Sequence, residues 1–357
     1  MPSPSPAGGL AVVPVVGMGE VEAGADLAGL LVDALTASGT GLGAGDCLVV
    51  SSKVVSKSLG LTWAGTREDA VAAGTVRVVA ERRSADGVTR VVESVAGPVM
   101  AAAGVDASNT GPSPDLLLLP DDPDAEAARL RTAMLARLEL PSATPLAVVL
   151  SDTAGRPWRD GLTDLALGSA GLTVLEDLRG ATDHDGRPLA VTTRAVADEV
   201  AAAADLVKGK ADGIPAALVR GLDVRWFSAD AAGARALVRV GPGDWFALGH
   251  VEAVRAALGL APGSPQAEEV GIRSALPGEP LAARVGRVVA LALLDVPEGS
   301  ADVGVDTESG TAEVALGAPD AYDLGRLVAR AEVAAASEGL RASLMARSIT
   351  TVSLTLG

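Results

Sequence analysis

The sequence predicts an α+β protein made of two domains. Apolar runs typical of buried strands alternate with amphipathic helices over the first 220 or so residues. The pattern weakens into Ala and Gly around residues 227–234, and a second mixture of helices and strands follows. With 357 residues, 48% of them hydrophobic, the chain can bury two cores. We therefore expect a larger domain at 10–245 and a smaller α+β domain at 246–357, after a disordered tail at 1–9.

Local signals place the elements of the larger domain in order. A buried strand at 10–16 precedes a helix from Asp26, its predicted N-cap, to Gly39. A second strand at 47–50 leads into the polar segment SSKVVSK at 51–57, which we expect to be a turn. Asp122 and Pro123 predict the start of another helix, which ends by Pro141. A further helix is expected at 194–207, ended by Gly209, and further strands at 88–104 (two, around Gly97-Pro98), 116–119, 146–150 and 216–219.

The smaller domain has its own set of signals. They predict an amphipathic helix at 251–258, an apolar run at 285–294, a hairpin at 303–316, a helix at 324–336 and a final strand at 349–356. The sequence contains no internal repeat.

Composition excludes several classes of function. A net charge of −16 argues against a nucleic-acid partner, because phosphate backbones are bound by clustered Lys and Arg. The single cysteine, Cys47, excludes internal disulfides and Cys-paired metal centres. No secretory signal and no long apolar run occurs, so a cytoplasmic protein without membrane contact is expected. His184 and His250 are predicted to be surface residues, which leaves carboxylates, Lys, Arg and metal ions to carry any chemistry.

Common nucleotide and hydrolase motifs are absent. Gly209-Lys210 is followed by Ala211, so it is no phosphate loop, and the glycine-rich run 39–45 precedes a strand and lacks dinucleotide-binding spacing. Neither a G-x-S-x-G elbow nor an H-E-x-x-H pair is present.

Three polar segments that follow apolar runs each carry an aspartate: Asp106, Asp152 and Asp212. Mg²⁺ and Mn²⁺ prefer the carboxylate and hydroxyl oxygens that such segments, with Thr153, offer. Acidic turns are also common as plain helix caps, so both interpretations stay open. The same holds for Ser51, Ser52 and Lys57 in SSKVVSK, which suit either a phosphate cradle or a solvated turn. A third acidic group, Asp121, Asp122 and Asp124, is predicted to serve helix capping.

Five segments together resemble the coenzyme F420-0:L-glutamate ligases, also called F420-0 γ-glutamyl ligases. The resemblance covers about residues 10–225 and keeps the family order. It is carried by SSKVVSK at 51–57, AGVDASN at 103–109, LLLLPDDPD at 116–124, SDTAGRPWRDG at 151–161 and VADEVAAAADLVKGKADGIPAALVRGL at 196–222.

The resemblance implies the family's own α+β fold of mixed sheets with helices, an intertwined homodimer, and a two-metal site that uses GTP. The metal ligands it implies are Asp106, Asp152 and Thr153. Many members have Gln or Glu where this chain has Lys210, so the third metal position falls to Lys210 or its neighbour Asp212. The implied GTP contacts are Val16, Gly17, Met18, Gly19, Ser51, Ser52, Lys57, Asn109, Lys208, Gly209, Lys210, Ala211, Asp212 and Gly213.

The implied reaction joins L-glutamate to coenzyme F420-0 through an acyl phosphate made from GTP. Asp106, Asp152 and Arg156 are the expected catalytic residues, and Arg156 with Arg159 could clamp a carboxylate or simply be surface arginines. The expected requirements are GTP, Mg²⁺ or Mn²⁺, and K⁺. Two rival functions stay open: a metal-dependent nucleotide phosphohydrolase and a non-catalytic scaffold that binds the coenzyme.

The last 110 or so residues depart from a known family arrangement. In fused relatives the ligase domain is followed by a flavin-binding, nitroreductase-like domain, whereas residues 246–357 are shorter and lack an Arg/Ser-rich segment for a flavin phosphate. A degenerate remnant of that domain and an unrelated cap both stay open, and we expect no bound flavin.

Overall fold

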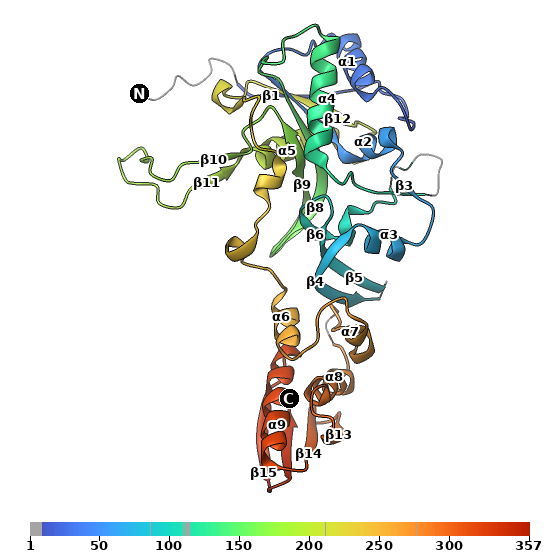
Figure 1. The fold of residues 1–357 in the computed structure, drawn as a ribbon, viewed down its shortest axis with the longest axis vertical. Coiled ribbons are helices and arrows are strands. Elements are labelled where there is room, and N and C mark those ends of the chain that lie inside the picture. The colour runs from blue at the N-terminus through green and yellow to red at the C-terminus, as the bar shows by residue number, and fades with distance from the viewer. Residues whose placement is uncertain (1–8, 86, 109, 111–114, 211, 277) are drawn as a thin grey trace. The chain divides into compact units, whose positions relative to one another are not determined.

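A computed structural model describes residues 9–85, 87–108, 110, 115–210, 212–276 and 278–357. The chain forms two compact units, each built from helices and sheets, which confirms the expected α+β class (Figure 1). Unit 1 comprises residues up to 76 and 93–239, and unit 2 comprises 77–92 and 240–357. The segment 77–92 therefore belongs with the C-terminal part of the chain, and the predicted boundary near residue 245 stays a prediction.

A five-stranded sheet organises unit 1. Its order is β1 (Ala11–Pro14), β12 (Ala216–Arg220), β2 (Asp46–Ser51), β8 (Ala147–Arg156) and β9 (Arg159–Ala170). Neighbouring strands are antiparallel except β2 and β8, which run parallel with Ser51 opposite Ser151. Successive side chains of a strand point to opposite faces of a sheet. Both faces of this sheet are covered by helices, so the side chains on both faces are apolar.

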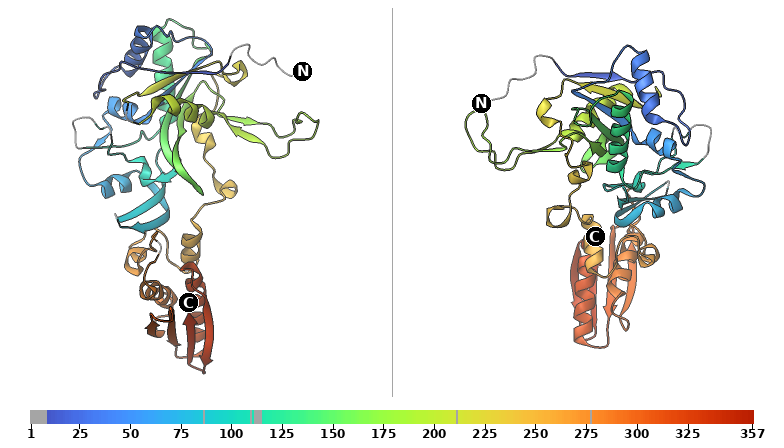
Figure 2. Two further views of the ribbon diagram at one scale, coloured as in Figure 1. Left: turned by 180° about the vertical axis from the view of Figure 1, so that it is seen from behind. Right: turned by 45° about the horizontal axis from the view of Figure 1, so that its top comes forward.

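Three helices cover the sheet. α1 (Leu27–Ala37) and α4 (Pro123–Arg137) pack on the face that carries Leu48 and Val50. α5 (Val196–Lys208) packs on the opposite face, against Cys47 and Val49. The predicted caps are confirmed: the Asp26 carboxylate accepts from Gly29 N, and the Asp122 carboxylate accepts from Ala125 N. Figure 2 shows α4 and α5 on the two sides of the sheet.

The prediction of a turn at 51–57 is wrong, because the segment is helical. α2 (Ser52–Leu59) begins directly after β2 and ends at Gly60, whose φ of 67° suits a residue without a side chain. Ser52, Val55 and Ser56 fall on the buried face at helical spacing. Small hydroxyl residues made this face look polar in the sequence although it is buried.

The position of Asp152 also differs from expectation. The expected strand at 146–150 continues as β8 to Arg156 and pairs with β9, so Asp152 and Thr153 lie inside a hairpin and not in a turn after a strand. β9 was not anticipated, since its first half is exposed and polar. Pairing across the hairpin supplies the hydrogen bonds that keep this polar stretch extended.

Shorter elements complete unit 1. The expected strand at 116–119 is reduced to two residues, and the two strands around Gly97-Pro98 are confirmed. β10 and β11 form a two-stranded ribbon that projects away from the five-stranded sheet (Figures 1 and 2). The bounds, including the strands β4 and β5 that lie mostly in unit 2, are β3 (Thr62–Trp63), α3 (Arg67–Ala73), β4 (Thr75–Ser84), β5 (Gly87–Ser94), β6 (Val99–Ala101), β7 (Leu116–Leu117), β10 (Leu175–Asp177) and β11 (Thr193–Ala195).

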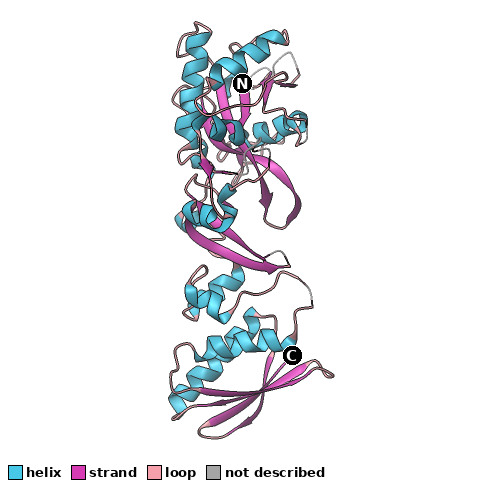
Figure 3. Cartoon of the chain, turned by 90° about the vertical axis from the view of Figure 1, so that its right-hand side faces the viewer, coloured by secondary structure: helices cyan, strands magenta, loops and turns pink. Residues whose placement is uncertain are grey.

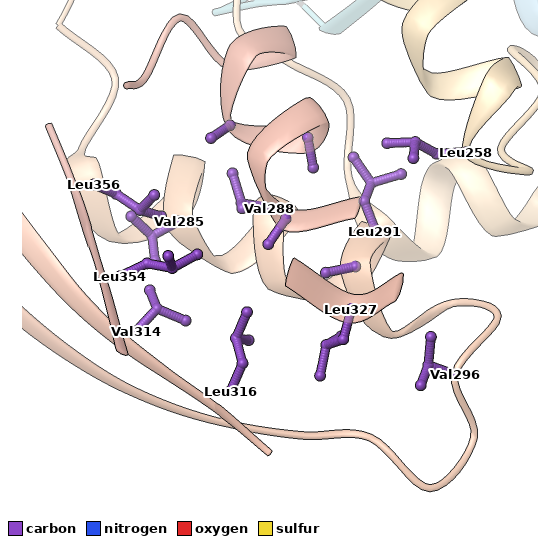
Figure 4. Close-up of a cluster of buried hydrophobic side chains, with 14 of the residues drawn as sticks. Leu258, Val285, Val288, Leu291, Val296, Val314, Leu316, Leu327, Leu354 and Leu356 are labelled. Atoms are coloured by element: carbon purple, nitrogen blue, oxygen red, sulfur yellow. The ribbon is translucent and has the colours of Figure 1, made fainter. Parts of the chain in front are cut away.

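Unit 2 contains a four-stranded antiparallel sheet in the order β13–β14–β16–β15. Helices lie on one face of this sheet (Figure 3), and the core between them contains Leu291, Leu327, Val314, Leu316 and Leu354 (Figure 4). The expected helices, hairpin and last strand are confirmed, and the apolar run 285–294 lies mostly in α8. The bounds are α6 (His250–Ala257), α7 (Pro265–Val270), α8 (Leu281–Leu293), β13 (Ser300–Asp306), β14 (Thr311–Gly317), α9 (Ala321–Ser337), β15 (Ala342–Arg347) and β16 (Thr351–Leu356).

Candidate functional site

Strand directions bring distant segments of unit 1 to one edge of the five-stranded sheet. Because β12 is antiparallel to β2, the segment before β12 lies beside the end of β2, and Ser51 N donates to Pro215 O at 2.8 Å. The end of β1 reaches the same edge, where Val15 N donates to Ala216 O at 2.9 Å. The parallel strand β8 carries Ser151 and Asp152 there as well.

A pocket of about 420 Å³ opens at this edge. It is lined by Gly19, Glu20, Val21, Ser51, Lys53, Val54, Lys57, Ser151, Asp152, Thr153, Asp164, Asp205, Lys208, Gly209, Lys210, Gly213, Ile214 and Pro215. This volume suits a small organic ligand.

The positive charge of the pocket comes from lysine alone. The whole chain has four lysines, Lys53, Lys57, Lys208 and Lys210, and all four line the pocket. The other basic residues are arginines, in a protein whose net charge is −16. A lysine ammonium is a compact point charge on a flexible stem, suited to phosphate oxygens. The pocket thus gathers every lysine of the chain, together with four carboxylates, Glu20, Asp152, Asp164 and Asp205.

Helix α2 supplies two of these lysines. Lys53 and Lys57 are four residues apart, so both project from the same side of the helix. Lys53 Nζ lies 2.7 Å from Asp106 Oδ2 and donates to Ser108 Oγ at 2.8 Å. Lys57 forms an ion pair with Glu20, in the segment after β1. The lysines thus link the helix to the loops on either side of it.

A buried network lies at the base of the pocket. Lys208, at the end of α5, places Nζ 2.6 Å from Asp164 Oδ2 and 2.7 Å from Ser151 Oγ. Ser151 Oγ donates to Asp164 Oδ2 at 2.8 Å, and Thr153 Oγ1 donates to Asp164 Oδ1 at 2.7 Å. The side chains of Lys208 and Asp164 are only 4% and 3% exposed. Burial would raise the pKa of Asp164, but the Lys208 ammonium and these hydrogen bonds hold it below its usual value.

Helix α5 ends at Gly209, whose positive φ of 60° favours glycine. Lys210 follows and donates from Nζ to the Thr153 hydroxyl. Among the described residues, Lys210 forms no ion pair with a carboxylate at contact distance.

The carboxylates of Asp152 and Asp106 flank the pocket, and their pKa values are shifted in opposite directions. Burial raises the pKa of Asp152 to about 6, and the charges of Asp164 and Asp106 add to this rise. Burial acts in the same direction on Asp106, but Lys53 and the hydrogen bonds from Ser108 outweigh it and lower the pKa of Asp106. Asp152 is therefore the pocket carboxylate that would gain most from a nearby cation.

The donor set fits a divalent cation only in part. Asp106, Asp152 and the Thr153 hydroxyl are hard oxygen donors of the kind that Mg²⁺ and Mn²⁺ prefer. Over the described part of the chain, however, no group of three or more His, Cys, Asp and Glu is arranged to hold a metal ion. Mg²⁺ is commonly held by one or two carboxylates together with the phosphates of a substrate. The residues present suit a cation of that kind, completed by a bound nucleotide.

The structure brings many predicted site residues together. Those that line the pocket are Gly19, Ser51, Lys57, Asp152, Thr153, Lys208, Gly209, Lys210 and Gly213. Asp106 adjoins them through Lys53. Those outside the lining are Val16, Gly17, Met18, Ser52, Arg156 and Asp212; Ser52 is buried, and Arg156 is exposed near the hairpin tip. Asn109 and Ala211 lie outside the described residues. The roles assigned to all of them stay predictions.

Sequence reasoning missed Lys53, Asp164, Ser151 and Asp205. The spacing of Lys53 and Lys57 would have indicated a shared helix face, had the segment been recognised as helical. No local signal marks Asp164, because its role depends on the pairing of β8 with β9, where it lies opposite Thr153.

The expected surface position of the two histidines is confirmed. His184 and His250 are exposed. Cys47 is fully buried, and burial, then the charge of Asp46, raises the pKa of its thiol well above the usual range.

The sequence model of the F420-0:Gamma-glutamyl ligase family matches residues 16–221. The chain belongs to this family. Proteins called "Coenzyme F420:L-glutamate ligase" are similar to it: that of Halobacterium salinarum is 38% identical over 253 residues, and that of Natronomonas pharaonis is 37% identical over 249 residues. These alignments cover 65% and 63% of this chain and 93% and 90% of the relatives.

The matched range contains every residue that lines the pocket, from Gly19 to Pro215. The resemblance seen in the sequence is therefore confirmed. No helix in the described ranges is long and apolar enough to span a membrane.

Proposed function

We propose that the protein joins L-glutamate to coenzyme F420-0 by an amide bond, at the expense of GTP and with a divalent cation. The observation that carries the proposal is the coincidence of the family match at 16–221 with the lysine-lined pocket. Relatives named for ligation of L-glutamate to coenzyme F420 supply the substrates. The four ammonium groups of the pocket are balanced by four carboxylates, Glu20, Asp152, Asp164 and Asp205, so polyanionic reactants would need the added charge of a bound divalent cation.

The reaction we propose proceeds in two transfers. A carboxylate oxygen of F420-0 attacks the γ-phosphorus of GTP, which gives an acyl phosphate and GDP. The amino group of glutamate then attacks the acyl carbon, phosphate departs, and the amine proton is released to solvent. A divalent cation would neutralise charge on the transferred phosphoryl group.

The chain's own residues bind and orient these reactants. Lys57 and Lys210 project ammonium groups into the pocket, where they would attract phosphate oxygens. Asp106 and Asp152 would hold the cation, and the buried Lys208–Asp164 pair keeps Ser151 and Thr153 in place behind it. Preorganised charges of this kind reduce the reorganisation needed in the transition state.

Incubation with GTP, Mn²⁺, L-glutamate and F420-0 tests the proposal by mass spectrometry. A ligase yields F420-0 heavier by glutamyl units, with one GDP per bond formed. A phosphohydrolase yields phosphate without a glutamyl product, and a coenzyme-binding scaffold yields neither; either result would refute the ligase.

Three further expectations belong to the same proposal. We propose a homodimer, which light scattering on the purified protein measures. We propose that K⁺ supports activity, which replacement by tetramethylammonium tests. Cytoplasmic location is proposed as well, and fractionation of the source cells tests it.

A further inference from the structure

We propose that the pocket takes one divalent cation per bound nucleotide, and that the Lys210 ammonium supplies the charge a second divalent cation would otherwise bring. The inference rests on the proposed nucleotide use and concerns how this chain balances the charge. It follows from an account of which oxygen atoms in the pocket remain free to bind a cation.

Asp164 is already neutralised. Its Oδ1 accepts from Thr153, and its Oδ2 accepts from both Lys208 and Ser151. The carboxylate is buried and carries its counter-charge with it. A carboxylate with three donors, one of them an ammonium at 2.6 Å, has little left to offer a metal ion.

Thr153 is committed in a similar way. Its hydroxyl gives its hydrogen to Asp164 Oδ1 and accepts a hydrogen bond from Lys210 Nζ. One lone pair remains. A divalent cation on that oxygen would lie beside the Lys210 ammonium, and like charges so close repel strongly where water is partly excluded.

Asp152 is in a different position. Over the described residues it forms no ion pair, although Asp164 and Asp106 lie close enough to affect it electrostatically. Asp106 pairs with Lys53 through Oδ2 and accepts from Ser108 N through Oδ1 at 2.7 Å, which leaves further lone pairs on both oxygens. Asp205 also lines the pocket, close enough to Lys208 and Lys210 for both ammonium groups to act on it electrostatically. The acceptors without either of these two ammonium groups beside them are therefore those of Asp152 and Asp106.

The four lysines of the pocket differ in whether they pair with a carboxylate. Lys53, Lys57 and Lys208 each have a carboxylate partner: Asp106, Glu20 and Asp164. Lys210 contacts a hydroxyl instead and lies on an exposed loop beside the oxygens of Thr153. Its ammonium thus contacts the Thr153 hydroxyl and acts on Asp205, the two groups on which a second cation would depend.

Counting bound Mn²⁺ by electron paramagnetic resonance tests the inference. The protein is saturated with the β,γ-imido analogue of GTP, and free Mn²⁺ is titrated against the complex. We expect one tightly bound Mn²⁺ per wild-type chain and two in Lys210→Glu, whose carboxylate would join Thr153 as a ligand. The two ions would also show the spin coupling of metals about 4 Å apart.

Arg129→Glu is the control, since it makes the same change of charge on α4, at a residue that does not line the pocket. We expect it to bind one Mn²⁺. Two ions in the wild type, one in Lys210→Glu, or two in Arg129→Glu would each overturn the inference. Should Lys210→Glu lose the nucleotide, the wild-type count decides alone. Failure of the wild type to bind the analogue would overturn the proposed function as well, whereas a nucleotide complex with two ions would overturn only this inference.

Discussion

The buried pair of Lys208 and Asp164 should contribute to stability far more than the other ion pairs of the pocket. Lys208→Met keeps the length of the side chain and removes its charge, which leaves the Asp164 carboxylate buried with only Ser151 and Thr153 as donors. Removing one partner of a buried pair costs about 3–5 kcal/mol, because the other charge remains uncompensated. For a unit of roughly 200 residues this corresponds to a fall in Tm of about 6–20 °C.

Urea denaturation followed by circular dichroism measures the effect. Lys53→Met is the matched control: it removes a pocket lysine whose partner Asp106 is 34% exposed, and such pairs contribute about 1 kcal/mol or less. The double variant Lys208→Met with Asp164→Asn should lose less stability than the two single losses added together, by roughly 1–3 kcal/mol. Equal losses in Lys208→Met and Lys53→Met, or strict additivity, would refute the reasoning.

The pH dependence has a definite sign. The pKa of Asp164 is lowered in the folded protein, so its stabilisation is present above the ordinary carboxyl pKa and is lost as pH falls through the lower folded value. The stability gap between wild type and Lys208→Met should therefore be full near neutral pH and narrow in acid. A gap that widens in acid would contradict the assignment of Asp164 as the ionised partner.

Three more outcomes are expected. Asp152→Asn should retain the fold and lose ligation by at least about a hundredfold, because an amide binds a divalent cation poorly; near-normal ligation with unchanged Mn²⁺ dependence in a mass-spectrometric assay would remove Asp152 from the site. Lys57→Ala should weaken GTP binding about tenfold in calorimetry, with Arg129→Ala, a remote surface change, as control. The purified protein should be colourless, and stoichiometric flavin absorbance would contradict this. A variant that lacks residues 240–357 and has residues 77–92 replaced by a short turn should still ligate glutamate, because every pocket residue lies in unit 1. A truncated protein that folds but does not ligate would contradict the second expectation.

Local rules account for the parts of the fold that the sequence revealed. The helices α1, α4 and α5 were predicted because their caps and apolar faces involve residues three or four positions apart. By contrast, α2 was missed because three serines occupy its buried or boundary positions. The hairpin of β8 and β9 was missed because a polar strand is recognised by its partner and not by its own composition.

In the candidate site, too, residues indicated by a local pattern were predicted, and residues that depend on distant partners were not. Asp106, Asp152 and Thr153 were proposed because their residue types suit metal ions, and Lys57 because its segment resembled a family motif. The role of Asp164 depends on its contact with Lys208, 44 residues away in the sequence. The role of Lys53 depends on its contact with Ser108, 55 residues away, so no single segment indicates either residue. The parallel pairing of β2 with β8 sets the ends of both strands at one edge and brings these distant segments together.

Because all four lysines line one pocket, chemical modification of lysine side chains would report on the occupancy of that pocket. Reagents that acylate primary amines normally scatter over a protein surface, whereas here the only side-chain amines are those that line the candidate site. The α-amino group is distinguishable, because it titrates about two pH units below a free lysine. Mass-spectrometric footprinting of four positions would thus read ligand occupancy directly, with Lys208 shielded by burial as an internal reference and with no labelled ligand or engineered probe.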